Sequence, residues 1–461
     1  MKRLMNTVFL FSQLISPHGI HAEDLLAVYR EALQDNPQLE QAREGFEAVM
    51  EGQSQANAAL FLPEANLSAN VSRDFQNVQV SGGGVGASGY SAFYSSFYNL
   101  SITQPLLHYD RWLAVDQADS RLAQAEAETT NTEIALMLKV AERYFDVLAA
   151  EDNLEFAKAR QQSLERRLTE TRQRQAVGYL ALTDVQEAQS GYDSAVADAI
   201  AADHQLQDAH EALREVSGAR QDHLARLTAD IPLTPPDPAD EQRWIELALT
   251  QNMGLLANEK AVQVAKDEIQ RLAAGHLPTL DAVGSHVYTT TGGRFGAADI
   301  EDNILGLNLN VPLYQGGRIS SKTREAEHHY RQAIASLNEQ KRAVHRAANK
   351  AYLGVVAGIS RVKALQQALK SSETGLAATQ AGFNAGRRTA LDIIVAEHQL
   401  LGAQRDYARS RYDYLLDTLR LKQAVGTLSP QDLGQINSWL KPDSHSDSHP
   451  VSRNKNKYDE Q

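Results

Sequence analysis

The fold of this 461-residue chain is decided by the stretch from Ala188 to Val216, which reads AQSGYDSAVADAIAADHQLQDAHEALREV. Its apolar positions step alternately by four and three residues along the chain: Ala188, Tyr192, Ala195, Ala199, Ala202, Leu206, Ala209, Leu213 and Val216. This heptad spacing is typical of helices that wind around one another. Because alanine is frequent at these positions, we expect neighbouring helices, including those of other chains, to approach closely over many turns.

A second copy of this seam lies in the later half of the chain, at Ala396, Leu400, Ala403, Tyr407, Ser410, Tyr414, Asp417, Leu421 and Ala424. Shorter motifs recur in the same order: Ala32-Leu33-x-x-Asn36 as Ala248-Leu249-x-x-Asn252, Leu62-Pro63 as Leu277-Pro278, Val177-Gly178 as Ala385-Gly386, and Ser217-Gly218 as Val425-Gly426. Repetition of this kind indicates an internal tandem repeat. We predict a first repeat over residues 23–218, a proline-rich linker over 219–240, a second repeat over 241–426, and a C-terminal segment with a polar tail over 427–461.

Each repeat contains segments in which apolar and small polar residues alternate. The alternation is clear over residues 65–72, 98–103 and 305–311, and less clean over 280–290. A strand with one apolar and one small polar face fits a wall between lipid and water. The glycine-rich stretch 81–89 between the first two strands predicts a hairpin loop. Its G-x-G-x-x-G spacing does not open a helix, so we reject a dinucleotide site there.

An aromatic cluster follows that glycine-rich loop, at Tyr90, Phe93, Tyr94, Phe97 and Tyr98. Such residues are typical of the aromatic girdle of a membrane barrel. The alternative is the aromatic core of a soluble sheet.

Two long helical segments are predicted, over residues 112–176 and 319–383. At the rise of an α-helix each would extend about 100 Å, a reach comparable to that of a periplasm and far beyond the helices of ordinary globular domains. Four strands per chain cannot close a barrel, and open sheet edges are not tolerated in lipid. Two chains would give a barrel filled by its own side chains, and three would leave a passage. The predicted fold class is therefore a mixed one, with a membrane β-barrel of 12 strands closed by a trimer and a long α-helical barrel of periplasm-spanning coiled-coil helices.

Composition and the N-terminus bear on location and chemistry. The net charge is -13, which argues against a nucleic-acid partner, and the chain has no cysteine. Residues 1–22 read as a signal peptide, with basic Lys2 and Arg3, an apolar core over 4–15 and a cleavage site after Ala22. Without cysteine, a lipoprotein anchor is excluded. We find no nucleophile elbow, no H-E-x-x-H and no cluster of metal ligands in the sequence, so we expect no enzyme, no cofactor and no metal site.

With these features the chain resembles the TolC family of outer-membrane channels, in its non-lipidated form, over about residues 23–440. The motifs that carry the resemblance are VGYLALTDVQ from Val177, AGFNAGRRTALD from Ala381, and AVGTL from Ala424. The resemblance implies a homotrimeric channel-tunnel in the outer membrane that extends into the periplasm and exports drugs, secreted proteins or both. It also implies docking with a periplasmic adaptor and with an inner-membrane transporter of the RND, ABC or MFS class. The alternative is a trimeric coiled-coil adhesin or structural protein of the cell envelope.

The resemblance further implies a gate at the periplasmic tip. Family members hold this tip closed with links that use an aromatic residue, an arginine and an aspartate, which match Phe383, Arg388 and Asp184. Phe383 lacks the hydroxyl of the tyrosine that is common at this place. The family entrance carries two acidic rings, and here Asp392 matches the first whereas the second position is Val395.

Helix capping is the alternative role for Asp184 and Asp392. Thr389 and Asp392 have the T-x-x-D spacing of a capping box. The two roles are compatible, because three symmetry copies of a capping aspartate would still crowd one axis.

Overall fold

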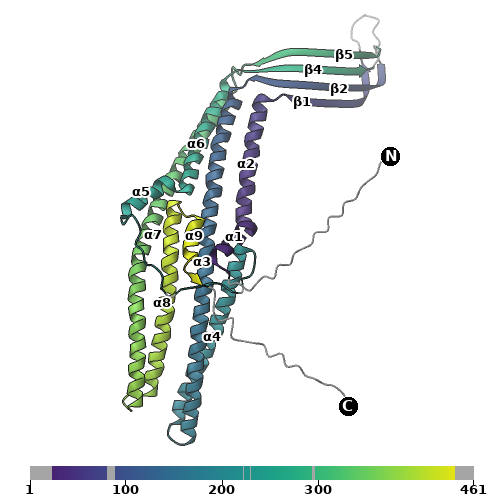
Figure 1. Ribbon diagram of the computed structural model, residues 1–461. Coiled ribbons are helices and arrows are strands. Elements are labelled where there is room, and N and C mark those ends of the chain that lie inside the picture. Colours follow the sequence, from purple (N-terminus) through teal and green to yellow (C-terminus); the bar gives the residue numbers. More distant parts are fainter. Residues whose placement is uncertain (1–22, 80–88, 222, 229, 293–295, 442–461) are drawn as a thin grey trace, which may run out of the picture.

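The computed structural model describes residues 23–79, 89–221, 223–228, 230–292 and 296–441. The predicted signal peptide, most of the glycine-rich loop and the polar tail after Lys441 lie outside these residues. Figure 1 shows a stack of long helices with a four-stranded sheet that leaves its upper end sideways. The predicted combination of four strands with long helices is confirmed. Within the described residues, no helix is both long enough and apolar enough to cross a bilayer.

The same order of elements occurs twice along the chain. The first set is α1 (Leu25–Asp35), α2 (Pro37–Phe61), β1 (Glu64–Val78), β2 (Gly89–Leu107), α3 (Tyr109–Ala176) and α4 (Leu182–Ser217). The second set is α5 (Glu241–Gln251), α6 (Met253–Ala273), the 3₁₀ turn η1 (Ala274–His276), β4 (Thr279–Thr291), β5 (Ala298–Asn310), α7 (Arg318–Asn384) and α8 (Ala390–Val425). Between and after them lie β3 (Arg226–Leu227), α9 (Pro430–Asn437) and β6 (Leu440–Lys441), and β3 pairs with β6. The N-terminal helical region is divided into two helices, because Asn36 ends α1 and caps α2.

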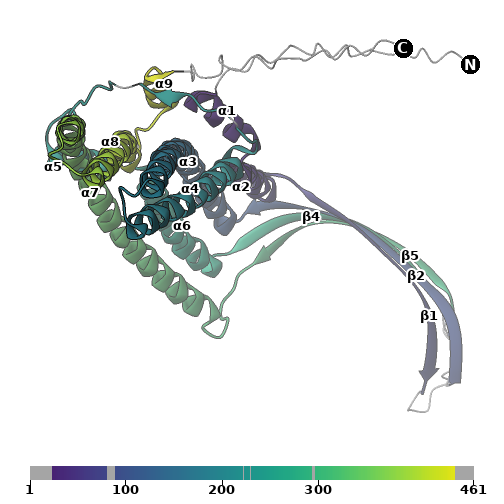
Figure 2. The same ribbon diagram turned by 90° about the horizontal axis from the view of Figure 1, so that it is seen from below.

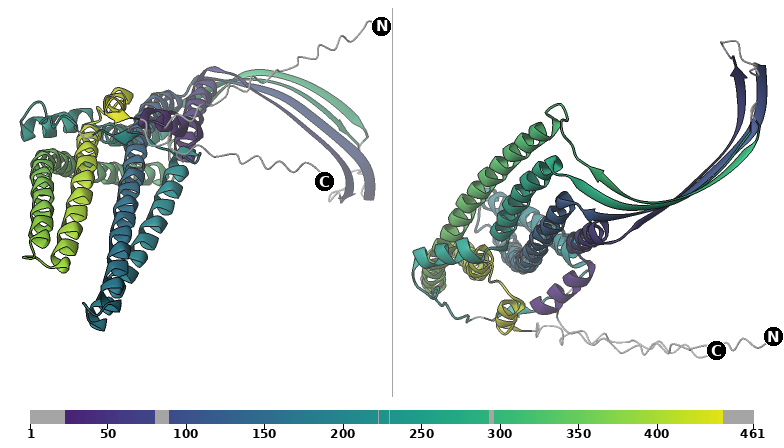
Figure 3. Two further views of the ribbon diagram at one scale, coloured as in Figure 1. Left: turned by 60° about the horizontal axis from the view of Figure 1, so that its bottom comes forward. Right: turned by 90° about the horizontal axis from the view of Figure 1, so that it is seen from above.

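The sheet is antiparallel with strand order β1-β2-β4-β5. We call the face that carries Leu67, Leu100 and Leu307 the apolar face, and the opposite face, which carries Asn66 and Ser101, the polar face. The apolar face is open, with Leu67 71% and Leu307 69% exposed. Figures 2 and 3 show the sheet bending away from the helices in one continuous arc.

The strand register corrects the prediction of one aromatic girdle. Tyr90, Tyr94 and Tyr98 lie on the apolar face, as a girdle requires. Phe93 and Phe97 lie on the polar face, because successive side chains of a strand point to opposite sides. The girdle prediction is therefore wrong for these two residues.

The helices form four columns in the order of the strands. In the upper half the neighbours are α2, α3, α6 and α7, and in the lower half they are α4, α3, α8 and α7. Two columns run through both halves, because α3 has 68 residues and α7 has 67. At the α-helical rise each extends about 100 Å. The other two columns are broken, with α2 standing above α4 and α6 above α8 (Figure 1).

An asparagine joins the two parts of each broken column. Asn36 accepts a hydrogen bond from the Leu39 backbone N–H as the N-cap of α2, and its Nδ2 donates to the Val216 carbonyl of α4 over 3.0 Å. Asn252 caps α6 and donates to the Ala424 carbonyl of α8 over 2.9 Å. Each asparagine therefore satisfies free donors at the start of one helix and a free acceptor at the end of another. This shared contact explains why both residues recur in the repeat.

The glycine after each lower helix allows this close approach. Gly218 and Gly426 have φ of 83° and 88°, the left-handed conformation that favours glycine. A Cβ on Gly426 would lie 2.5 Å from the Gln251 carbonyl oxygen, and one on Gly218 would lie 2.8 Å from the Asp35 Cβ. Both column joints therefore require a residue without a side chain.

Buried aromatic residues hold the middle of the molecule. Tyr144 and Phe145 on α3 are fully buried, and the Phe145 ring stacks on Tyr412 of α8 with centroids 5.5 Å apart. The Tyr144 hydroxyl donates to the Ala225 carbonyl over 2.8 Å, which fixes the linker against α3. Burial raises the pKa of the Tyr144 hydroxyl, so it remains a donor at all physiological pH values.

The alanine seam of α4 lies inside one chain. Ala195 is 0% and Ala202 is 3% exposed, and α4 packs on α3 of the same chain. The expectation that these alanines contact neighbouring chains is therefore wrong, because the hairpin of α3 and α4 buries them before any assembly.

Replacing Ala195 with Leu should destabilise this hairpin by about 1–3 kcal/mol, because extra methyl groups overpack a closed core. Ala197 on the same helix is exposed and provides the matched control, since Ala197→Leu adds the same volume at the surface. Thermal unfolding of the two purified variants, followed by circular dichroism, measures the difference. Equal melting temperatures for both variants would contradict the packing described for Ala195.

Replacing Gly426 with Ala should lower stability by roughly 1–3 kcal/mol, because the new Cβ meets a backbone carbonyl and the positive φ strains any other residue. Gly434→Ala in α9 is the control, since a Cβ there meets nothing within 4 Å. The same melting experiment compares them, and a Gly426→Ala variant as stable as Gly434→Ala would argue against the tight joint.

Candidate functional site

The lower end of the molecule consists of two helical hairpin tips. The turn after α3 and the turn after α7 each use a glycine with positive φ, Gly178 at 82° and Gly386 at 70°. Apolar side chains are open to solvent at the tips, with Tyr179 82%, Val177 67% and Leu391 64% exposed. In the single chain these side chains have no cover, which is typical of a surface that contacts another protein.

Asp392 is held in a capping box at the start of α8. Its Oδ2 accepts hydrogen bonds from the Thr389 backbone N–H over 2.7 Å and from the Thr389 hydroxyl over 2.9 Å. These bonds hold the pKa of the Asp392 carboxyl below its ordinary value. A lowered folded-state pKa means that the carboxylate stabilises the cap above the ordinary pKa of an aspartate, and that this contribution is lost as the pH falls through the lowered value. Asp392 therefore remains charged under mildly acidic conditions.

Asp184 has the equivalent position in α4. Its Oδ2 accepts a hydrogen bond from the Ala181 backbone N–H over 2.9 Å. The capping role predicted as the alternative for both aspartates is therefore confirmed, with one difference between the repeats. Asp392 has a hydroxyl partner in Thr389, whereas residue 181 is an alanine and offers no side-chain acceptor to the helix.

The other predicted gate residues gather around the α7–α8 turn. Phe383 is half-buried near the end of α7, and Val395 is 48% exposed one turn into α8. The Arg388 side chain lies against Gly382, where a Cβ would be 2.8 Å from its Cγ, and its Nη1 is 3.8 Å from Asp392 Oδ1. Among the described residues of one chain, the partner of Arg388 is therefore Asp392 and not Asp184. The predicted link between Arg388 and Asp184 stays a prediction about neighbouring chains.

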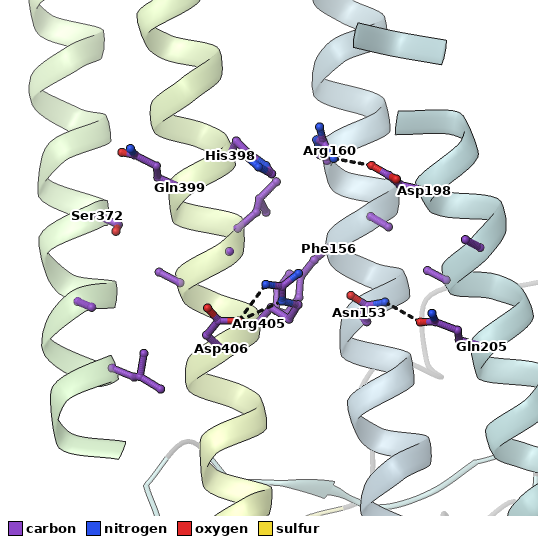
Figure 4. A pocket seen from close by; sticks show the side chains of 18 residues that line it. Asn153, Phe156, Arg160, Asp198, Gln205, Ser372, His398, Gln399, Arg405 and Asp406 are labelled. Carbon is purple, nitrogen blue, oxygen red and sulfur yellow. Dashed lines mark hydrogen bonds and ion pairs between the residues drawn. The ribbon is translucent and has the colours of Figure 1, made fainter. Parts of the chain in front are cut away.

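A groove separates the two hairpins above their tips (Figure 4). It has a volume of about 770 Å³, with α3 and α4 on one side and α7 and α8 on the other. Its polar side chains pair within their own side: Arg160 with Asp198 over 2.6 Å, Asn153 with Gln205 over 3.3 Å, and Arg405 with Asp406 over 3.0 Å. No pair drawn there bridges the two sides, so this part of the groove is open to an inserted partner.

Contacts between α3 and α8 close the groove at its two ends. Above it, Tyr412 donates to Asp152 over 2.8 Å, Arg409 pairs with Asp146 over 3.2 Å, and Arg420 pairs with Glu142 over 2.8 Å. Burial raises the pKa of the Asp152 carboxyl. Toward the tips, Ser163 donates to Glu397. The sequence analysis missed the groove, because its partners are separated by more than 200 residues and follow no local pattern.

The junction of helices and sheet carries exposed aromatic side chains that the sequence analysis also missed. Trp112 and Phe61 contact edge to face with centroids 5.6 Å apart, and both are about half exposed. Tyr109, at the start of α3, and Tyr314, between β5 and α7, are 51% and 88% exposed. Aromatic residues between an apolar sheet and polar helices are typical of a membrane–water interface.

Comparisons with known proteins agree on one family. The family model described as outer membrane efflux protein matches residues 28–219 and 244–427. The chain is 35% identical to the outer membrane protein TolC of Vibrio cholerae, over 92% of this chain and 95% of that protein. It is 28% identical to the alkaline protease secretion protein AprF of Pseudomonas aeruginosa, over 94% of this chain and 90% of that protein.

Solved structures of outer-membrane channels share the fold. The CmeC outer membrane channel of Campylobacter jejuni superimposes with a TM-score of 0.76 at 15% identity, covering 91% of this chain and 90% of that one. The outer membrane protein VceC of Vibrio cholerae gives a TM-score of 0.70 at 22% identity, covering 87% of this chain and 96% of that one.

Proposed function

This chain belongs to the outer membrane efflux protein family, and on that premise we propose that three copies join into one channel-tunnel that exports its cargo through an inner-membrane pump and a periplasmic adaptor. Members of this family are efflux and secretion channels rather than enzymes, and the chain is an outer-membrane protein. We therefore do not retain the adhesin alternative.

The observation that carries the trimer is the pair of open edges on each chain. Within the described part of the chain, strands β1 and β5 each pair on one side only, which leaves a row of backbone groups that lipid cannot satisfy. Because the strands alternate in direction, β5 of one chain would meet β1 of the next in the antiparallel sense. The helical columns have the same order, so closing the sheet brings α7 of one chain beside α2 and α4 of the next. Three chains of four strands give a 12-stranded barrel, wide enough for a passage.

Adaptor and pump docking is supported by the lower end of the chain. Exposed apolar side chains at both tips, such as Tyr179 and Leu391, suit contact with another protein. The groove between the hairpins is lined by residues of all four helices, and its Arg160–Asp198 and Arg405–Asp406 pairs lie within one side, so an inserted helical partner would leave these charges paired. The cargo class we propose is drugs, secreted proteins or both, in keeping with relatives named for efflux and for protease secretion.

Assembly tests the proposal directly. The protein purified in mild detergent should have a mass of three chains, should stay trimeric in SDS before heating, and should conduct ions in planar bilayers. Mass photometry gives the first result and single-channel recording the last. A monodisperse monomer without conductance would overturn the channel proposal.

The gate we propose lies at the α7–α8 turn. Three copies of Asp392 would form one acidic ring, with three copies of Val395 one turn deeper as an apolar collar that raises the cost of wetting the closed pore. Phe383 would support the turn from its half-buried place at the end of α7. When the tips approach, Arg388 would leave Asp392, its partner within the chain, and pair with Asp184 of a neighbouring chain.

Replacing Asp392 with Asn should cut cation selectivity by about half or more, because carboxylates around a narrow mouth concentrate cations. Arg388→Ser removes the neighbouring positive charge and should change selectivity in the opposite sense, and Asp392→Glu should retain it. The measurement is the reversal potential in asymmetric salt. Full cation selectivity in Asp392→Asn would leave this residue a helix cap only.

A further inference from the structure

The polar face of the sheet carries an apolar patch near the hairpin ends of the strands. Five of the apolar residues that the strand register places on this face form what we call the outer patch: Phe93, Phe97, Val287, Ile300 and Ile304. Phe97 pairs with Thr289 and Thr289 pairs with Ile300, so the patch crosses three strands.

The outer patch is not needed for lipid contact, because the opposite face supplies that surface. Phe97 is 37%, Ile304 is 50% and Ile300 is 54% exposed, so these side chains are open. Nearer the helices the same face carries small polar residues such as Asn66, Ser101 and Asn308. In a closed barrel this face lines water, and exposed apolar area there is an affinity for apolar solutes.

Two carboxylates lie within the outer patch. Asp302 stands between Ile300 and Ile304 on β5, and Asp74 is directly opposite Phe93. Among the described strand residues, the polar face carries no Lys, Arg or His. The Asn99 Oδ1 on the same face is buried and accepts no hydrogen bond within the described part of the chain. All charged side chains on the polar face of the described strands are therefore negative.

We propose that the outer patch binds lipophilic organic cations on their way out of the tunnel. This inference rests on the trimeric channel proposed above. The phenyl rings of Phe93 and Phe97 offer apolar area and a negative π-face to a cation, and Asp302 and Asp74 offer counter-charge. Three copies around one lumen give a ring of equivalent weak sites, and weak binding at several sites lets a solute both enter and leave. Anionic amphiphiles are disfavoured by the same carboxylates.

The experiment uses the full-length channel in planar bilayers with tetraphenylphosphonium as the probe. Tetraphenylphosphonium should reduce the single-channel current, and tetraethylammonium, which has the charge but no rings, should need a roughly tenfold higher concentration for the same block. Phe97→Ser and Asp302→Asn should each raise the half-blocking concentration of tetraphenylphosphonium by roughly fivefold or more. Phe97→Tyr and Asp302→Glu, which keep the ring and the charge, should restore block.

Tyr94→Ser is the matched control, because it removes an exposed ring from the opposite face of the same strand. The proposal is supported if tetraphenylphosphonium blocks Tyr94→Ser as strongly as the wild type and blocks Phe97→Ser and Asp302→Asn more weakly. Conducting Phe97→Ser channels with unchanged block would overturn it, as would equal loss in Tyr94→Ser. Loss in Phe97→Ser with none in Asp302→Asn would refute the cation class. Absence of conductance in the wild type would instead refute the channel proposal on which this inference rests.

Discussion

Two asparagine side chains at mid-height join the upper and lower helices of the two broken columns. Asn36 joins α2 to the end of α4, and Asn252 joins α6 to the end of α8. Because α3 and α7 run unbroken through both halves, these joints complete the other two columns, so that four helical columns lie below four strands. Each joint satisfies free backbone groups of two helices with one amide side chain.

The sequence predicts secondary structure best where apolar residues recur at a regular spacing. The alternation over residues 65–72 predicts a strand, and the heptad spacing over residues 188–216 predicts a helix. The structure has β1 and α4 at these positions. Spacing alone does not show which helix covers an apolar stripe. The seam at Ala195 is therefore expected to include contacts with other chains, whereas in the structure α3 of the same chain covers it. The break in the helical pattern at Asn36 does have a local signal, because Pro37 disfavours a helical conformation at the residue before it and suits the first position of a new helix. Only the hydrogen bond of Asn36 to the Val216 carbonyl, 180 residues away, has no local signal.

The candidate site also has parts that a local sequence pattern predicts and parts that only the fold brings together. The T-x-x-D spacing before α8 is local, and it correctly predicted the capping role of Asp392. The groove and its contacts depend on pairs such as Tyr412 and Asp152 that only the folded hairpins bring together. At the tip, one carboxylate both caps a helix and carries the charge of the proposed gate. The hydrogen bonds that fix Asp392 also keep it ionised, so the geometry of the turn and its electrostatics are set by one pair of bonds.

The open edges of the sheet also bear on how the protein reaches its assembled form. In the described residues of one chain, β1 and β5 each have an outer edge without a strand partner, beside an open apolar face. This combination invites incorrect pairing. In the proposed trimer, closure needs three chains at once, so productive association would slow steeply on dilution, whereas a wrong pairing needs only two. Assembly of the proposed trimer would therefore depend on the local concentration of chains at the membrane, and a factor that delays sheet formation until three chains meet would favour the barrel over aggregates.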